Sequence, residues 1–347
     1  MTSTSRSVSD LGERGLIELI SRRVGAPSEG EVWGGDDAAV VDFPAGRLVV
    51  TTDVLVEAVD FDFAYCPPQD AGWKAVAVNV SDIAAMGAVP RHAVATLSLS
   101  PDTSVVDVES ILDGMLGAAE MYGVALVGGD VSTASELSIG LTLIGAMQGE
   151  RRPVLRSGAL GGDAICVTGE LGGAAGGLIA LKNKPSGGLR SGWDVGEDLE
   201  SPLNKLAARQ LRPAARLTES RALGAVELTA MIDISDGLLA DLEHVLDASG
   251  AGSQIDPEMI PVDENLYFLD KLVADLDPIE LALTGGEDYE LIVMLDPANV
   301  ADARLAVEHM GTKLTRIGTV MTGSERRVGE QPFSAWKEKG WEHLRTP

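Results

Sequence analysis

The clearest candidate for chemistry is a short stretch in which two aspartates flank a serine, Asp233-Ile234-Ser235-Asp236, with Gly237 next. An apolar lead-in precedes it and a helix-like run follows it, a pattern that predicts a strand end, a tight turn and a helix start. Carboxylates gathered at such a turn suit a hard cation, and exposed backbone N–H groups at a helix start suit a phosphate. Taken alone, the stretch is equally compatible with an ordinary helix cap beside a solvated charge.

Similar acids recur beside Gly, Ser or Thr at the ends of other predicted elements. If these carboxylates converge, they cannot all stay ionised without cations between them, because like charges at short range repel strongly. Oxygen ligands without His or Cys select Mg²⁺, Mn²⁺ or Ca²⁺, and Mg²⁺ is usually shared between protein and phosphate oxygens. The pattern therefore favours a metal site for a polyphosphate substrate. The acids are Asp36, Asp53, Asp82, Asp130, Asp233 and Asp236.

Asp82 lies where a stable helix would not place an acid. The apolar spacing predicts a helix over residues 70–86, with Gly87 as its C′ residue. A carboxylate in the last turns opposes the helix dipole by roughly 0.3–1 kcal/mol. Asp82 is therefore a better cation ligand than most acids of the chain, unless the helix ends earlier and Asp82 is a solvated loop residue.

Length and element pattern predict two domains of α/β or α+β class. At 347 residues the chain can bury two cores. A basic, proline-containing segment, Arg151-Arg152-Pro153, places the boundary between domains 1–150 and 151–347. We expect a flexible start over residues 1–11 and a mobile loop over 183–200. The expected helices cover 16–20, 70–86, 105–122, 171–181, 206–223, the run up to 249 and 266–273, and the main expected strands cover 48–53, 92–100, 124–127, 136–147 and 163–169.

Charge and cysteine content exclude several classes. A formal net charge of −26 argues against nucleic acid or an anionic membrane surface as a partner, but not against a phosphate substrate with intervening cations. Cys66 and Cys166 are the only cysteines, so we expect a reducing, cytoplasmic location and packing roles for both. Neither a signal peptide nor an apolar run of about 18 residues is visible.

The common nucleotide and hydrolase motifs are missing. The chain has no P-loop, no G-x-G-x-x-G and no kinase-type catalytic loop. With 4 histidines and no G-x-S-x-G, a Ser-His-Asp hydrolase is also disfavoured.

One family combines all the acidic motifs in this order. The set resembles that of the thiamine-monophosphate kinases, from Gly12-Glu13 to Trp341. The matching motifs are Gly34-Gly35-Asp36-Asp37, Thr51-Thr52-Asp53, Asn79-Val80-Ser81-Asp82, Gly128-Gly129-Asp130, Arg156-Ser157-Gly158, Asp233-Ile234-Ser235-Asp236-Gly237 and Gly285-Gly286-Glu287-Asp288-Tyr289-Glu290.

The resemblance implies the two-domain fold of the aminoimidazole-ribonucleotide (AIR) synthetase-like superfamily. In it, the N-terminal domain binds metal and ATP and forms a β-barrel shared with a second subunit, so a homodimer is expected. The C-terminal α/β domain completes the active site. The implied reaction is ATP-dependent phosphorylation of thiamine monophosphate to thiamine diphosphate with several Mg²⁺ ions.

The resemblance also implies residue roles. Asp82, Asp130 and Asp236 would be catalytic, and Glu287 and the ring of Trp341 would contact thiamine. Asp60 stands where the family has a substrate-side His, which makes that contact uncertain. ATP would be bound by Gly129, Asp130, Arg156 and Ser235, and metal by Asp36, Thr51, Thr52, Asp53, Asp82, Asp130, Asp233 and Asp236.

Two other readings remain open. One is another enzyme of the superfamily that activates an amide or carbamoyl group, although the chain lacks the terminal cysteine motifs of selenophosphate synthesis and hydrogenase maturation. The other is a non-catalytic MgATP-binding protein.

A weak internal repeat is also visible. An Asp-containing turn precedes Gly128-Gly129-Asp130, and another precedes Gly285-Gly286-Glu287.

Overall fold

The computed structural model describes residues 6–27, 29, 31, 39, 41–43, 46–183 and 201–336. These residues form two compact units. The first holds the described residues up to Ile83 together with Ala88–Arg151, and the second holds Ala84–Gly87 and the described residues from Arg152 onward.

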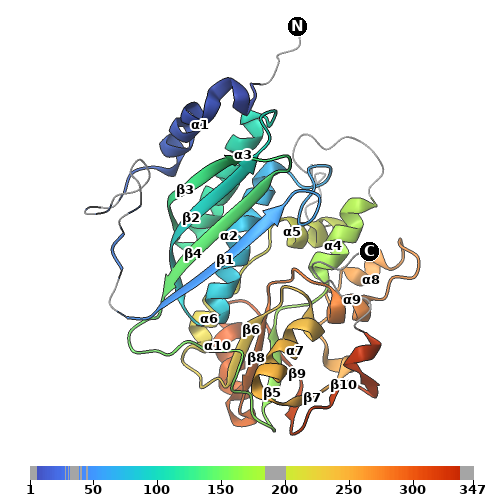
Figure 1. Ribbon diagram of the computed structural model, residues 1–347. Coiled ribbons are helices and arrows are strands. Elements are labelled where there is room, and N and C mark those ends of the chain that lie inside the picture. The colour runs from blue at the N-terminus through green and yellow to red at the C-terminus, as the bar shows by residue number, and fades with distance from the viewer. Residues whose placement is uncertain are drawn as a thin grey trace. The chain divides into compact units, whose positions relative to one another are not determined.

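The first unit is an open sheet with two long helices packed on one face (Figure 1). The strand order is β1-β4-β2-β3. β2 and β3 run parallel because α3 connects them, and the other pairs are antiparallel. Within the described residues β1 and β3 remain open edges, so this sheet does not close into a barrel. The elements are α1 Val8–Val24, β1 Leu48–Val56, α2 Pro68–Ala85, β2 Val89–Leu99, α3 Val105–Tyr122, β3 Ala125–Thr133 and β4 Ser138–Ala146.

Two glycines let α2 and α3 pack in backbone contact. A Cβ at Gly72 would overlap the carbonyl oxygen of Ile111, and one at Gly114 would overlap that of Gln69. Each helix therefore needs glycine at the crossing. This contact joins the first turns of α2 to α3, and Asp82 lies near the other end of α2.

The second unit is a seven-stranded sheet of order β11-β10-β7-β9-β5-β8-β6. Its strands are β5 Ala164–Thr168, β6 Ala230–Asp233, β7 Gly252–Ile255, β8 Leu291–Leu295, β9 Leu314–Met321, β10 Arg326–Val328 and β11 Gln331–Pro332. Its helices are α4 Gly173–Lys182, α5 Pro202–Leu211, α6 Leu217–Leu223, α7 Leu238–Ser249, α8 Leu266–Leu269, α9 Pro278–Thr284 and α10 Val300–Glu308, with 3₁₀ turns at Pro257–Met259, Pro297–Asn299 and Phe333–Ala335.

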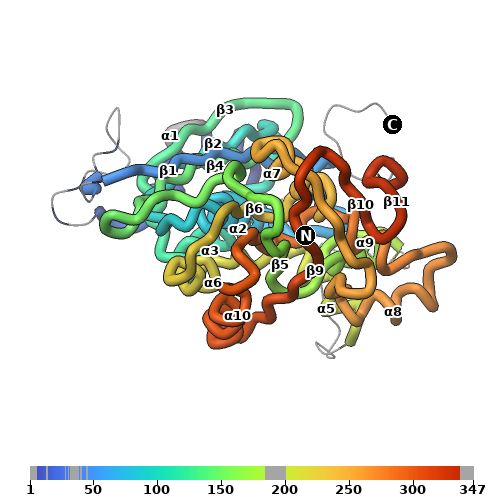
Figure 2. Tube along the Cα trace, turned by 90° about the horizontal axis from the view of Figure 1, so that it is seen from below, coloured from blue at the N-terminus to red at the C-terminus, as the bar shows by residue number. Residues whose placement is uncertain are grey.

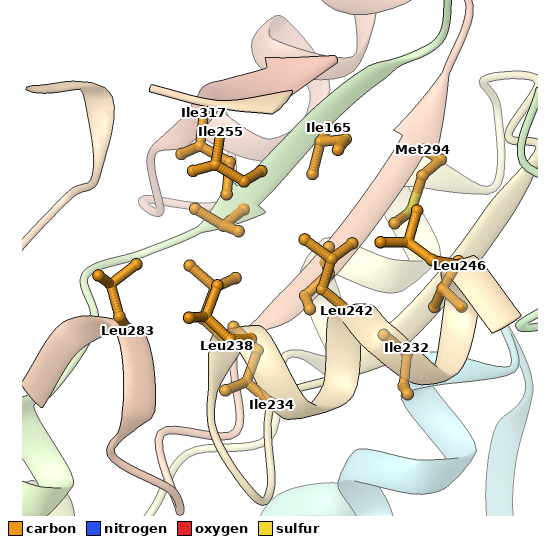
Figure 3. Close-up of a cluster of buried hydrophobic side chains, with 14 of the residues drawn as sticks. Ile165, Ile232, Ile234, Leu238, Leu242, Leu246, Ile255, Leu283, Met294 and Ile317 are labelled. Carbon is orange, nitrogen blue, oxygen red and sulfur yellow. The ribbon is translucent and has the colours of Figure 1, made fainter. Parts of the chain in front are cut away.

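Helices cover both faces of this sheet. Ile165 points into a core with Leu238, Leu242 and Leu246 of α7 (Figure 3). Cys166 belongs to a second core that contains residues of α6 and α10, and Figure 2 shows α7 and α10 on opposite sides of the sheet. Strands buried on both faces read as continuous apolar runs, which explains the sequences of β5 and β8.

Both cysteines pack as expected. Cys66 and Cys166 are buried and free. Burial raises the pKa of the Cys166 thiol to about 11, so this residue is a packing group and not a nucleophile. No helix in the described residues is long and apolar enough to cross a membrane.

Several expected boundaries need correction. α1 begins at Val8, inside the residues predicted to be a flexible start. Pro213 is expected to start or kink a helix within 206–223, and the structure has two separate helices there, one ending at Leu211 and one beginning at Leu217. The loop expected over 183–200 lies outside the described residues from 184 onward. The predicted helix over 105–122 is confirmed with the same limits, as is the positive φ of Gly87 after α2.

Asp53 and Asp130 do not lie at strand ends. β1 continues to Val56, and β3 runs through Gly128 and Gly129 to Thr133. The Gly-Gly pair is therefore strand and not turn. A Cβ at Gly129 would overlap the carbonyl oxygen of Ala95 on β2, so glycine marks a close approach of two strands.

Candidate active site

The first unit brings Asp53 of β1 and Asp82 of α2 together. Thr51 donates a hydrogen bond from Oγ1 to Asp82 Oδ2 at 2.5 Å. Burial is the main cause that raises the pKa of Asp53 to about 6, and the charge of Asp82 and a hydrogen bond with it add to the shift. Two carboxyls bond only when one carries a proton, so a cation between them would replace that proton.

Thr52 does not join this group through its side chain. Its hydroxyl donates to the carbonyl oxygen of Leu141 at 3.1 Å and accepts from Thr142 Oγ1 at 3.0 Å. Successive side chains of a strand point to opposite faces, so the hydroxyls of Thr51 and Thr52 diverge.

Gly129 and Asp130 lie on the edge strand β3, separated from β1 by β4 and β2. Both are exposed. Within one copy of this unit, the sheet order therefore keeps Asp130 on a different strand edge from Asp53.

Asp60 closes the loop after β1. Its Oδ2 accepts from the N–H of Val56 at 2.8 Å, and its backbone oxygen accepts from Lys74 Nζ at 3.3 Å. Its charge also contributes to the raised pKa of Asp53. Asp60 therefore lies near the acidic pair, with one carboxylate oxygen already used to hold the backbone.

In the second unit, Asp233 ends β6 and Asp236 lies in the turn before α7, as predicted. The turn is held from inside by Asp241, whose Oδ2 accepts from the N–H groups of Ser235, Asp236 and Gly237 at 2.9, 3.0 and 3.1 Å. The expectation that these N–H groups suit a phosphate is wrong, because Asp241 already occupies them. The turn offers carboxylates, which suit a cation.

Asp241 is a residue of this candidate site that the sequence prediction missed. It is 2% exposed, and burial followed by the charges of Asp233 and Asp236 raises its pKa to about 8. Ligand atoms of Asp236, Asp241 and His244 lie within 4.8 Å of one another. The only signal in the sequence was an acid in the first turn of a helix, which ordinary dipole pairing also explains.

The Gly285–Glu290 segment lies directly against this turn. Glu287 N–H donates to the carbonyl oxygen of Ser235, and Tyr289 N–H donates to that of Ile234, both at 2.8 Å. Ile234 N–H donates back to the Glu290 carbonyl oxygen at 2.8 Å. In the second unit, the two echoing motifs are thus neighbours in space.

Glu287 is held in an unusual backbone conformation. Its φ is 70° and that of Tyr289 is 51°, a left-handed region that non-glycine residues seldom adopt. Strain of this kind concentrates at functional sites. The Glu287 carboxylate accepts from Gln210 Nε2 of α5 at 2.5 Å.

Arg156 lies at the other end of α7. Ser249, the last residue of that helix, accepts at Oγ from the N–H groups of Gly158 and Ala159, both at 3.1 Å. The same hydroxyl donates to the carbonyl oxygen of Arg156 at 3.5 Å. Ser235 lies before the N-terminus of α7, so the helix separates Arg156 from Ser235, two of the four residues predicted to bind ATP.

Asp36 and Trp341, the remaining predicted site residues, lie outside the described residues.

Two family models match the chain. The AIR synthase related protein N-terminal domain matches residues 35–147, and its C-terminal domain matches residues 161–329. The thiamine-monophosphate kinase of Rhodopirellula baltica is 35% identical over 325 residues, which cover 90% of this chain and 91% of the relative.

Solved structures agree. The crystal structure of thiamine-monophosphate kinase from Stenotrophomonas maltophilia K279a superposes with a TM-score of 0.78 at 34% identity, covering 91% of this chain and 96% of that one. AaThiL complexed with AMPPCP and TMP has a TM-score of 0.73 at 33% identity, covering 99% and 100% of the two chains.

Proposed function

The chain belongs to the thiamine-monophosphate kinase family, and from that premise we propose that it transfers the γ-phosphate of ATP to thiamine monophosphate. The products are thiamine diphosphate and ADP. The observation that carries the proposal is the similarity, over 99% of this chain, to a structure that holds an ATP analogue together with TMP.

The acidic residues fit a role in holding Mg²⁺. Asp53 and Asp82 lie close enough to share a proton, and Asp233 and Asp236 surround a buried third carboxyl. Such groups are stable as anions only with a hard cation beside them. When bound, Mg²⁺ neutralises phosphate oxygens and orients the transferring group. The proposed ligands are Thr51, Asp53, Asp82, Asp233 and Asp236, with Asp36, Thr52 and Asp130 as further ligands by resemblance.

The chain's own residues then have to position two anions. The acceptor phosphate is mostly dianionic near pH 7 because its second pKa is about 6, so no general base is needed. Catalysis of phosphoryl transfer rests on positioning and electrostatics. We propose that Arg156 contacts ATP and neutralises part of its charge, and that Glu287 contacts the cationic thiamine group. The contacts of Gly129, Asp130 and Ser235 with ATP and of Asp60 and Trp341 with thiamine stay predictions.

The outward face of the first unit's sheet fits a homodimer. Leu48, Val50 and Val54 of β1 are 50%, 61% and 57% exposed, and Val94 of β2 is 37% exposed. A row of apolar side chains on an open sheet is typical of an interface. We propose that a second copy covers this face and completes a shared barrel. The cytoplasmic location and the role of the second domain in completing the active site also stay predictions.

The proposal is tested by ADP release from ATP and Mg²⁺ with thiamine monophosphate, thiamine or no acceptor. Release that requires the monophosphate is expected. An enzyme that activates an amide or carbamoyl group would not respond to this acceptor, and a non-catalytic MgATP-binding protein would bind ATP without release in any condition.

A further inference from the structure

The side-chain amide of Gln210 has a defined orientation, but only its nitrogen has a hydrogen-bond partner among the described residues. It lies on α5 and is 4% exposed. Its Nε2 donates to Glu287 Oε2 at 2.5 Å. A carboxylate only accepts hydrogen bonds, so the NH₂ group must face Glu287 and the amide oxygen must point elsewhere.

That amide oxygen has no hydrogen-bond partner among the described residues, although it is buried. The other acids of the segment that carries Glu287 do have donors. Asp288 accepts from the N–H groups of Gly172 and Ala174, and Glu290 accepts from Thr168 and from two nitrogens of Arg216. A buried acceptor without a donor costs free energy, and native structures tolerate it mainly where it has a task.

The position of Gln210 is set by backbone packing. α4 and α5 approach so closely that a Cβ at Gly177 would lie 3.0 Å from Gln210 Cβ and would overlap the carbonyl oxygen of Leu206. Glu287 is fixed from the other side by its bond to Ser235. The carboxylate and the amide are therefore a preformed pair and not two mobile surface groups.

We propose that Gln210 and Glu287 together recognise an amino-substituted, cationic heteroaromatic group, with Gln210 Oε1 as the acceptor for the amino N–H. This inference rests on the proposed function, in which the acceptor carries an aminopyrimidine beside a cationic ring. Glu287 supplies the negative charge. Gln210 supplies a neutral oxygen that can accept a hydrogen bond only from a ligand with an N–H donor at that position. A site built to accept a substrate hydrogen bond rejects analogues that lack the donor.

The test compares thiamine monophosphate with an analogue whose pyrimidine amino group is replaced by an oxo group. Wild type, Gln210→Met and Gln210→Glu are assayed for kcat and for KM of acceptor and ATP. Acceptor binding is measured by calorimetry with the ATP analogue AMPPCP. Methionine keeps the length of the side chain but cannot accept the bond. Gln254→Met is the matched control, because Gln254 is a partly buried amide on β7 that bonds only to backbone oxygens.

We expect Gln210→Met to raise the KM and the Kd for thiamine monophosphate about 10- to 100-fold, with kcat and the KM for ATP unchanged. Discrimination against the oxo analogue should fall by the same factor. Gln210→Glu should be worse, because it places a second carboxylate against Glu287. Gln254→Met should match wild type.

If a folded Gln210→Met enzyme keeps the wild-type KM for thiamine monophosphate and the wild-type discrimination against the oxo analogue, the proposed recognition by Gln210 is wrong. That result would mean that Oε1 holds only a structural water. An equal rise of both KM values would contradict it too, because that indicates a general packing defect. If the wild type forms no thiamine diphosphate, the proposed function fails, and the pair fails with it.

Discussion

Asp241 determines what the turn before α7 can bind. A pattern of carboxylates and helix-start N–H groups predicts either a cation or a phosphate site. The structure favours a cation, because one carboxylate oxygen of Asp241 already accepts three of those N–H groups. This choice depends on a side chain one helical turn away, so the motif alone could not make it.

Substitutions of Asp241 should separate its role as hydrogen-bond acceptor for the turn from the role of its charge. Asp241→Ala leaves three N–H groups without their acceptor, so we expect a loss of about 1–3 kcal/mol in unfolding free energy and a higher Mg²⁺ requirement. Asp241→Asn keeps an acceptor oxygen and should retain most of the stability. Denaturant unfolding and Mg²⁺ titration of activity measure both effects. Asp296→Ala, at an exposed carboxylate that caps a surface turn, is the control, and equal effects at the two sites would contradict the assignment.

Asp288 should make the protein more stable, not less stable, as the pH falls from 6 to 4. Burial raises its pKa from 3.8 to about 6, although Arg209 and two backbone N–H groups oppose the shift. Between these values the folded state binds more protons than the unfolded state. The contribution of Asp288 to stability is therefore greatest below pH 4 and is lost as pH rises through 6.

The expected result is that Asp288→Asn destabilises the protein more at pH 4.5 than at pH 7.5. The expected difference is about 2 kcal/mol, at roughly 1.4 kcal/mol per pKa unit, because at pH 4.5 most of the unfolded chains already carry an ionised Asp288. Chemical denaturation of both proteins at the two pH values measures it. A larger cost at pH 7.5 would show that the pKa of Asp288 is lowered in the folded state.

At the scale of elements, the sequence predicted which helices and strands exist better than it predicted where they begin and end. Helix 105–122 has the expected bounds, because its apolar spacing is regular and Gly123 ends it with φ 71°. Asp53 and Asp130 were wrongly placed at strand ends. For Asp130 the reason is that a Gly-Gly pair, taken in isolation, signals a turn. Only the neighbouring strand, which passes too close for a side chain at Gly129, reveals why glycine is needed there.

The apolar face of β1 should control oligomeric state. Val50→Lys places a charge in the proposed interface between two copies, so we expect the dimer to shift to monomer. Light scattering coupled to size-exclusion chromatography measures this. Val106→Lys on α3 is the matched control, because both valines are 61% exposed. A monomeric wild type, or a dimer unaffected by Val50→Lys, would contradict the shared barrel.

At the scale of the molecule, the sequence predicted two α/β domains and the family, because the acidic motifs keep their order along the chain. It did not predict β7, β9, β10 or α10. The three strands pair in the second sheet, and α10 packs Ala303 and Val307 into a core of that unit, so these contacts rather than the local sequence define the four elements. Gln210 was also beyond reach, because a glutamine on an amphipathic helix reads as an ordinary polar residue.

A net charge of −26 and converging carboxylates predict that Mg²⁺ stabilises the whole protein. Several millimolar Mg²⁺ should raise the Tm by a few degrees, and EDTA should reverse the change. Thermal unfolding at matched ionic strength separates binding from screening. An equal effect of NaCl would show that the acids only repel one another and hold no cation.

The fate of the γ-phosphate tests the central claim most directly. The protein is incubated with ATP labelled at the γ-phosphate, Mg²⁺ and thiamine monophosphate, and the products are separated, with Asp82→Asn as the inactive control. We predict that the label moves to the terminal phosphate of thiamine diphosphate in equal amount to the ADP formed. Label recovered as inorganic phosphate, or label that stays in ATP while the nucleotide remains bound, would contradict the account.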